Sequence, residues 1–131
     1  MSDLLMKQDN DSPDAILAAA LPASRYVQHL LNSEPARKIN LLNNLHVPFQ
    51  RKEMQNFLES HSRQIANEDN LNSLLRDLRK QVILRLAIRD ISGLADLAEV
   101  MTCMTDLAEV TIDFALKYHE MWLAQPNRFG L

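Results

Sequence analysis

Apolar residues recur every three or four positions in the second half of the chain, which is the spacing of an amphipathic helix. The first such run comprises Leu71, Leu74, Leu75, Leu78, Val82 and Leu86. It predicts a helix over residues 71–91, preceded by a polar break at residues 67–70 and ended by Gly93, since glycine readily takes the positive φ that closes a helix. Asp96 and Glu99 then have the spacing of a capping box, which predicts the start of another helix.

That next helix is expected to run from 96 to 125, and its residues divide into two faces at about 100° per residue. The apolar face holds Leu97, Val100, Met101, Met104, Leu107, Ala108, Thr111, Phe114, Ala115, Tyr118 and Trp122. The polar residues between Glu99 and Glu120 lie opposite, within a sector of about 80°. We expect the apolar face to be buried and the polar face to be solvated. Two long helices joined by a short connection predict an antiparallel hairpin.

The helix over 71–91 changes character along its length. Its first half has one apolar side, whereas residues 82–91 are apolar almost all round, with Arg85 and Arg89 as interruptions. A helix that is apolar all round is buried on more than one side. One neighbour is the last helix, and the other must come from the N-terminal helices or from protein beyond residue 131.

The first half of the chain predicts shorter helices separated by prolines. Ser12-Pro13 has the pattern of an N-cap followed by a first helical residue, and Pro22 stops that helix. Further helices are expected over 24–32, over 35–45 with Ile39, Leu42 and Leu45 as apolar positions, and over 49–65. The prediction is an all-α fold in which these short N-terminal helices pack on the long antiparallel hairpin. Residues 1–12 would be a flexible tail and 13–125 one helical domain.

Composition narrows the classes of function. The 131 residues carry a formal charge of −3, which argues against a nucleic-acid partner. Cys103 is the only cysteine, so neither a disulfide framework nor a cysteine-rich zinc site is expected, and a single thiol fits a cytoplasmic location. The N-terminus lacks the pattern of a secretory signal, and the longest apolar stretch, residues 15–23, is far shorter than the roughly 20 residues of a membrane span.

No catalytic, cofactor-binding or metal-binding residue is predicted. His119-Glu120 begins like a zinc-hydrolase motif, but Leu123 stands where the second histidine would be. Arg85 and Arg89 on a largely apolar half-helix need partners, either a carboxylate of the same chain or, together with Asp90, another domain. A row of carboxylates could dock a basic partner or could be a solvated face. Its members are Glu99, Asp106, Glu109 and Asp113.

Two motifs lie on the two long helices. The first reads L-R-x-L-R-x-x-x-x-x-R-L-A-x-x-D and is formed by Leu75, Arg76, Leu78, Arg79, Arg85, Leu86, Ala87 and Asp90. The second is Leu97-Ala98-Glu99-Val100 followed by Thr105-Asp106-Leu107-Ala108-Glu109. In this order the two resemble the glutamine synthetase adenylyltransferase/adenylyl-removing enzyme family, which has Phe at the Leu78 position, Ile at the Leu86 position and Asp at the Glu109 position. The resemblance extends over residues 24–125 and is most specific over 75–109.

The resemblance implies a role in controlling nitrogen assimilation. Such enzymes attach AMP to a tyrosine of glutamine synthetase and remove it by phosphorolysis, in response to glutamine and the PII signal protein. They use ATP and Mg²⁺ at a Gly-rich turn followed by S-D-x-D, and this chain contains neither motif. The chain is therefore expected to be the N-terminal helical region, non-catalytic by itself, with the catalytic domain in cis. Residues 126–131 would begin the linker to that nucleotidyltransferase domain.

A stand-alone helical interaction module is the alternative to this enzyme-derived interpretation. It would dock partners through the carboxylate row or through the apolar end of the 82–91 segment.

Overall fold

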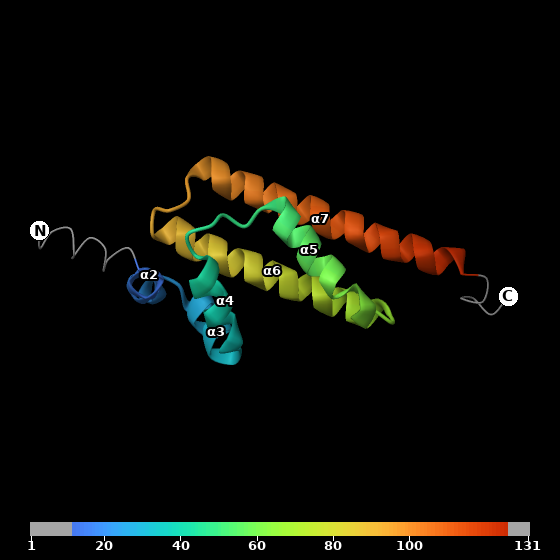
Figure 1. Ribbon diagram of the computed structural model, residues 1–131, viewed down its shortest axis with the longest axis horizontal. Coiled ribbons are helices and arrows are strands. Elements are labelled where there is room, and N and C mark those ends of the chain that lie inside the picture. Colours follow the sequence, from blue (N-terminus) through green and yellow to red (C-terminus); the bar gives the residue numbers. More distant parts are fainter. Residues whose placement is uncertain (1–11, 126–131) are drawn as a thin grey trace, which may run out of the picture.

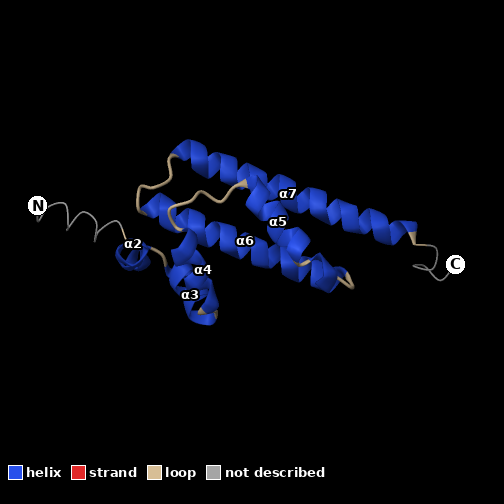
Figure 2. Cartoon of the chain, viewed as in Figure 1, coloured by secondary structure: helices blue, strands red, loops and turns tan. Residues whose placement is uncertain are grey.

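The computed structural model describes residues 12–125, so residues 1–11 of the tail predicted at 1–12, and the linker predicted at 126–131, lie outside the described residues. Its elements are α2 (Pro13–Ala20), the 3₁₀ turn η1 (Leu21–Ala23), α3 (Arg25–Ser33), α4 (Ala36–Asn44), α5 (Arg51–Ser60), the 3₁₀ turn η2 (Ser62–Gln64), α6 (Glu68–Ile91) and α7 (Leu97–Ala124). Within 12–125 every regular element is helical, which confirms the all-α prediction (Figure 2).

The predicted antiparallel hairpin is present: α6 and α7 run side by side in opposite directions and form the long axis of the molecule (Figure 1). Its turn closes with the hydrogen bonds of a Schellman motif. The N–H of Gly93, at φ 74°, donates to Asp90 O, and the N–H of Leu94 donates to Arg89 O. Because an L side chain is strained at this φ, the glycine is what allows the chain to turn here.

Side-chain caps fix the starts of four helices. Ser12, Ser24, Asn67 and Asp96 each accept a hydrogen bond from the backbone N–H three residues later. The predicted break at 67–70 is therefore wrong beyond its first residue. Asn67 is the N-cap of α6, and Glu68 and Asp69 occupy its first turn, where negative charge favours the helix dipole.

The second half of α6 is buried on two sides, as its sequence predicts. Leu84 and Ile88 pack into a core built from α2, α3 and α4. Val82 and Leu86 face another core that includes residues of α5 and α7. The additional neighbour is thus the N-terminal arm, α2 to α4, which lies beside the turn end of the hairpin (Figure 1).

Two short helices differ from the prediction. In α4, Ile39 is 66% exposed, and Leu41 takes its place in the core together with Leu45. The helix expected over 49–65 runs only from Arg51 to Ser60, because the chain departs from helical geometry at His61 before η2.

The face that α7 buries is the largest correction. The residues packed against α5 and α6 include Cys103, Leu107 and Val110. Leu97, Met101 and Met104, which the sequence placed in the core, are exposed. The reason is that α5 packs against α7 as well as α6, so α7 is turned toward two neighbours and not toward α6 alone.

Candidate functional site

Arg85 is the most buried charged residue, with 1% of its surface exposed. Its two terminal nitrogens donate to the two carboxylate oxygens of Glu53 on α5, at 2.8 and 2.7 Å. The guanidinium carbon also lies 4.1 Å from the centre of the Phe49 ring, a cation–π geometry. Arg85 therefore joins the middle of α6 to the start of α5.

Arg89, one turn further along α6, binds three separate segments. Its Nε and Nη2 donate to the carboxylate of Glu99 at 2.8 Å each, Nη1 donates to Leu45 O at 2.8 Å, and Nη2 also reaches Leu94 O. The hydrogen bonds to Glu99 raise the pKa of Arg89 above its usual value, although burial acts in the opposite direction. The residue holds the turn of the hairpin to the end of α4.

This bonding changes the capping box predicted at the start of α7. Asp96 accepts from the Glu99 N–H at 2.8 Å, as expected. The Glu99 carboxylate, which in a full capping box would bond back to the N-cap residue, is instead taken by Arg89.

Both arginines thus have partners within the chain, the first of the two alternatives considered from the sequence. Asp90, grouped with them as a possible interdomain contact, is exposed near the end of α6. An interdomain role for these three residues stays a prediction.

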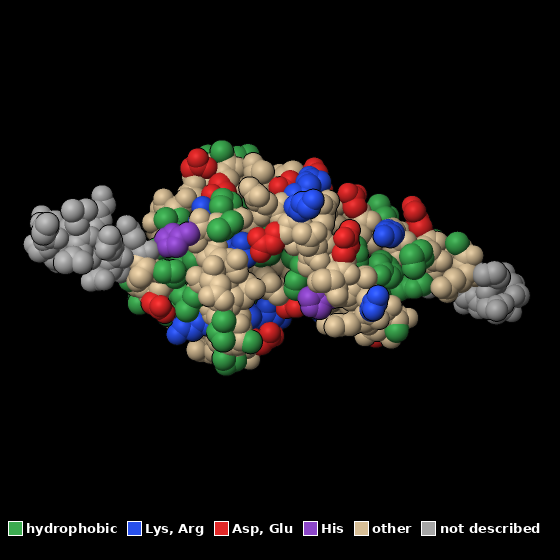
Figure 3. Space-filling view, viewed as in Figure 1, with side chains coloured by type: hydrophobic (Ala, Val, Ile, Leu, Met, Phe, Trp, Pro, Cys, Tyr) green, Lys and Arg blue, Asp and Glu red, His purple; other side chains and the backbone are tan. Residues whose placement is uncertain are grey.

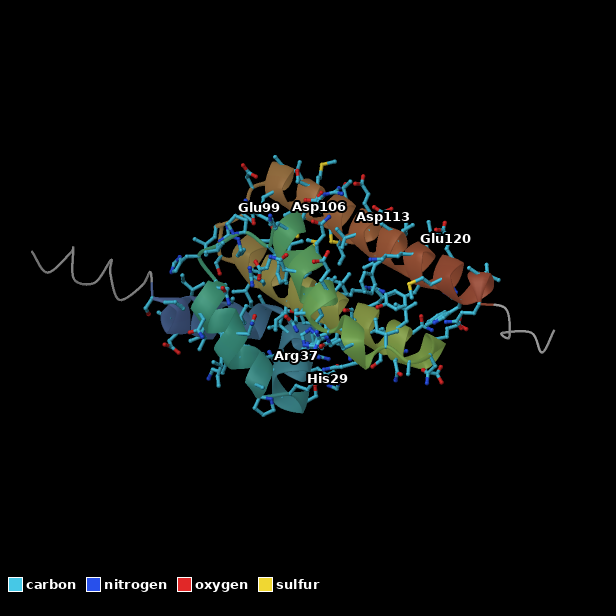
Figure 4. All side chains as sticks on the ribbon, turned by 45° about the vertical axis from the view of Figure 1, so that its right-hand side comes forward. His29, Arg37, Glu99, Asp106, Asp113 and Glu120 are labelled. Atoms are coloured by element: carbon cyan, nitrogen blue, oxygen red, sulfur yellow. The ribbon has the colours of Figure 1, made fainter. Side chains whose placement is uncertain are left out.

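The carboxylates along α7 fall into two groups in the structure, those bonded to an arginine and those exposed to solvent. Glu99, Asp106, Asp113 and Glu120 lie along one side of the helix (Figure 4). Asp106 and Glu109 both accept hydrogen bonds from Arg51 of α5, and Glu99 is held by Arg89. Asp113 and Glu120 are exposed. Acidic and basic side chains accordingly alternate where α5 meets α7 (Figure 3). Docking of a basic partner on this row stays a prediction.

Arg37 is a buried cation that the sequence analysis did not single out. Its Nη2 lies 2.8 Å from both Glu34 and Asp77, while Nε and Nη1 are buried and have no partner among residues 12–125. Burial lowers the pKa of Arg37, but the bonds to Glu34 and Asp77 outweigh that effect and raise it. The side chain, labelled in Figure 4, lines a polar cleft of about 440 Å³ that is bordered by α4, α6 and the η2 segment. The only sequence signal was Glu34 three residues before Arg37, because Asp77 is 40 residues away.

Cys103 is buried in the core that α7 shares with α5 and α6. Burial, with smaller contributions from Glu99 and Asp106, raises the pKa of its thiol to about 11. Its sulfur lies 3.6 Å from Phe49 O. A buried thiol with a raised pKa is a poor nucleophile at neutral pH.

An apolar surface on α7 is the other feature that the sequence analysis missed. We call Leu97, Met101, Met104, Ala108 and Ile112 the α7 stripe. All five are exposed, Leu97 by 73% and Met101 by 62%. Beside this stripe, α6 and α7 form a groove of about 550 Å³ that Leu75, Met104 and Ala108 help to line. The signal was present in the sequence, since these residues repeat at helical spacing, but they were assigned to the core.

The described region offers few groups for chemistry. Between residues 12 and 125, no group of three or more His, Cys, Asp or Glu side chains is arranged to hold a metal ion. Within the same range, no helix has the length and hydrophobicity that crossing a bilayer requires. Residues 12–125 form a helical frame with arginine hydrogen bonds inside it and the apolar α7 stripe on its surface.

Comparison with known proteins identifies relatives of this chain by sequence. A bifunctional glutamine synthetase adenylyltransferase/adenylyl-removing enzyme of Nitrosomonas eutropha is 48% identical over 116 residues, which are 88% of this chain and 12% of that protein. The enzyme of the same name from Nitrosomonas europaea is 48% identical over 122 residues, or 93% of this chain and 13% of that protein. The corresponding protein of Aromatoleum aromaticum is 38% identical over 100 residues. No solved structure matches the chain.

The chain therefore spans about 12% of the length of the curated relatives. The family described as glutamate-ammonia ligase adenylyltransferase matches residues 15–131, which is nearly all of the chain. The two motifs on α6 and α7 fall within that match. This chain belongs to the glutamate-ammonia ligase adenylyltransferase family.

Proposed function

We propose that this chain is the N-terminal helical region of a bifunctional enzyme that adenylylates and deadenylylates glutamine synthetase, and that it performs no chemistry by itself. The observation that carries the proposal is the family match over residues 15–131, combined with coverage of only 12% of a relative. ATP and Mg²⁺ would bind the nucleotidyltransferase domain in cis. Glutamine synthetase and the PII signal protein would be the partners of the whole enzyme, in the cytoplasm.

In this proposal the region acts as a structural frame for the rest of the enzyme. Arg85, Arg89 and Arg37 connect α6 to α5, to α7 and to the N-terminal arm through charge-assisted hydrogen bonds. The Arg85 and Arg89 pairs are bidentate, a geometry that fixes orientation as well as adding stability. The frame would hold its outer surfaces in a constant geometry for the catalytic domain and for the protein substrate.

The proposal is tested with the chain alone and with a chimera. The purified chain, given glutamine synthetase, ATP, Mg²⁺ and phosphate, should neither add nor remove AMP, and turnover above a blank would contradict its non-catalytic role. In the chimera, this chain replaces the matched segment of the Nitrosomonas eutropha relative. The chimera should modify glutamine synthetase, and the same relative lacking the segment should be impaired. A chimera no more active than the deletion would overturn the proposal.

A stand-alone interaction module is the second candidate, and the exposed α7 stripe is the observation that favours it. The gene separates the two candidates. Codons for the Gly-rich turn and S-D-x-D downstream of Leu131 would support the enzyme, and a stop codon directly after Leu131 would support the module.

A further inference from the structure

We propose that the α7 stripe and the adjacent groove bind an amphipathic helix from the part of the adenylyltransferase polypeptide that this chain does not span. The inference rests on the proposed function, because it takes the chain to be one region of that enzyme. It adds a specific docking surface and the charge pattern of its occupant.

The α7 stripe has the spacing of a helix-packing seam. Its five residues follow one another at intervals of four, three, four and four along α7. Alternation of three and four is the pattern by which one helix packs along another in a bundle or coiled coil. From Leu97 to Ile112 the stripe covers about 22 Å of helix at the standard rise of about 1.5 Å per residue. A single helix of ordinary length would cover it.

The stripe lies on a side of α7 that α5 leaves uncovered. Arg51 of α5 bonds to Asp106 and Glu109, on a different side of α7 from Met104 and Ala108. No α5 residue lines the groove, whose apolar surface comes from Leu75 of α6 and from α7. An added helix would therefore pack against the outer surface of α6 and α7 without displacing any element of the described fold.

The charges beside the groove indicate what the occupant looks like. Arg76 and Arg79 line its α6 side, and within residues 12–125 neither forms an ion pair. On the far side of the stripe, Asp113 and Glu120 are exposed carboxylates, whereas Glu109 beside them is already bonded to Arg51. The complementary partner is a helix with an apolar seam, carboxylates on the flank that meets α6, and basic residues on the flank that meets α7.

A second copy of this chain fits the surface poorly. Two α7 helices packed through their stripes would bring together the exposed Asp113 and Glu120 of both copies, which have no ion-pair partner within residues 12–125. Such like-charge opposition disfavours the pairing. The relatives, in contrast, have most of their length outside the matched segment, so the family enzyme has ample polypeptide to supply the helix.

Cysteine labelling tests the proposal in the chimera described above. Ala108→Cys places a thiol on the stripe, and Ile39→Cys places one on the exposed side of α4 as a matched control. Alkylation by iodoacetamide is followed site by site with peptide mass spectrometry, in the isolated chain and in the chimera. Native Cys103 is buried and should be slow in both. The thiol at position 108 should react at least about tenfold more slowly in the chimera, and the thiol at 39 at a similar rate in both.

Each other outcome counts against the proposal. Equal rates at position 108 in chain and chimera, or equal slowing at positions 39 and 108, would overturn it. Protection of position 108 that grows with the concentration of the isolated chain would assign the stripe to a second copy and also overturn it. Activity of the chimera with native Ala108 is measured separately, so failure of the proposed function is distinguishable from an uncovered stripe.

Charge reversal tests the predicted flank of the occupant. Arg76→Glu with Arg79→Glu in the labelled chimera should raise the alkylation rate at position 108 toward that of the isolated chain. Arg76→Lys with Arg79→Lys keeps the charge and should leave protection in place. Unchanged protection in the Glu variant would contradict the charge pattern proposed for the helix.

Discussion

The two halves of α6 carry the same kind of cation in opposite environments. Arg76 and Arg79, in the first half, are exposed beside the groove. Arg85 and Arg89, in the second half, are 1% and 5% exposed, and each holds a carboxylate with two nitrogens. The difference comes from the neighbours, because Leu84 and Ile88 in the second half pack into the core of the N-terminal arm while Val82 and Leu86 pack into the core shared with α5 and α7.

The second half of α6 replaces most of the hydrogen bonds to water that its two arginines lose on burial. A guanidinium taken out of water needs its hydrogen bonds replaced. Arg89 obtains replacements from a carboxylate and two backbone carbonyls. Arg85 obtains two from the Glu53 carboxylate and lies over the Phe49 ring, while its Nε is buried without a partner among residues 12–125. The same bonds tie three segments together, so the second half of α6 is where the fold is most dependent on single side chains.

The largest effect should come from removing Arg89. Arg89→Ala leaves Glu99 and Leu45 O without their donor, and we expect a loss of about 3 to 5 kcal/mol in the free energy of unfolding. Arg89→Lys should recover little of this, because an ammonium group cannot reproduce the two-nitrogen contact. Urea unfolding followed by circular dichroism measures both. A loss below about 1 kcal/mol would mean that the turn does not depend on this residue.

Breaking the Arg85–Glu53 pair should lower the free energy of unfolding by a smaller amount. The Glu53 side chain is 40% exposed, so water can partly take over its hydrogen bonds to Arg85. Glu53→Gln should cost about 1 to 3 kcal/mol, because the buried guanidinium loses its counter-charge. Replacing both partners, with Glu53→Leu and Arg85→Met, should restore most of that stability, as apolar pairs often match buried ion pairs. Chemical denaturation of the native chain, of Glu53→Gln and of the double variant measures the three free energies of unfolding. A double variant less stable than Glu53→Gln would contradict this account.

Alkaline pH should weaken the same region by a still smaller amount. The folded protein raises the pKa of Cys103 from 9.0 to about 11, so between these values the unfolded chain releases the thiol proton and the folded chain retains it. Unfolding is thereby favoured, and stability should fall as pH rises through this window. Cys103→Ala removes that contribution. Thermal midpoints at pH 8 and pH 10.5 should drop further for the native chain than for the variant, and equal drops would refute the burial argument.

Substitutions in the first half of α6 should change the free energy of unfolding least. Arg76→Ala with Arg79→Ala removes two exposed cations that form no ion pair within residues 12–125, so unfolding should change by no more than about 0.5 kcal/mol. Denaturation under the conditions used for Arg89→Ala provides the direct contrast. A loss comparable to that of Arg89→Ala would erase the distinction between the two halves.

The sequence predicted those parts of the fold that depend on local signals. Ser12, Gly93 and Asp96 mark helix ends through bonds to residues three or four positions away, and each lies where expected. The face that α7 buries does not depend on such a local signal. Cys103 and Val110 compete with Met101 and Met104 at similar spacing, and the choice is made by α5, an element 40 or more residues away in the chain.

The candidate site was predictable to the same extent. Arginines on an apolar half-helix require partners, and the structure supplies carboxylates. Their identities depend on tertiary packing, because Glu53 is 32 residues from Arg85 and Asp77 is 40 residues from Arg37. The exposure of the α7 stripe was not predicted, because each helix was assumed to have a single apolar face that is buried.

The turn that Arg89 holds has a consequence for the order of folding. Arg89 and Glu99 are ten residues apart, so joining them closes a short loop at small entropic cost. The arm's core instead brings Ile16 and Leu17 together with Leu84 and Ile88, across some seventy positions. Contacts between near neighbours in sequence form fastest. The pairing of α6 with α7 can accordingly begin at the turn and be complete before the N-terminal arm packs. The last residues of α6 would then already be in place when α2, α3 and α4 pack against them.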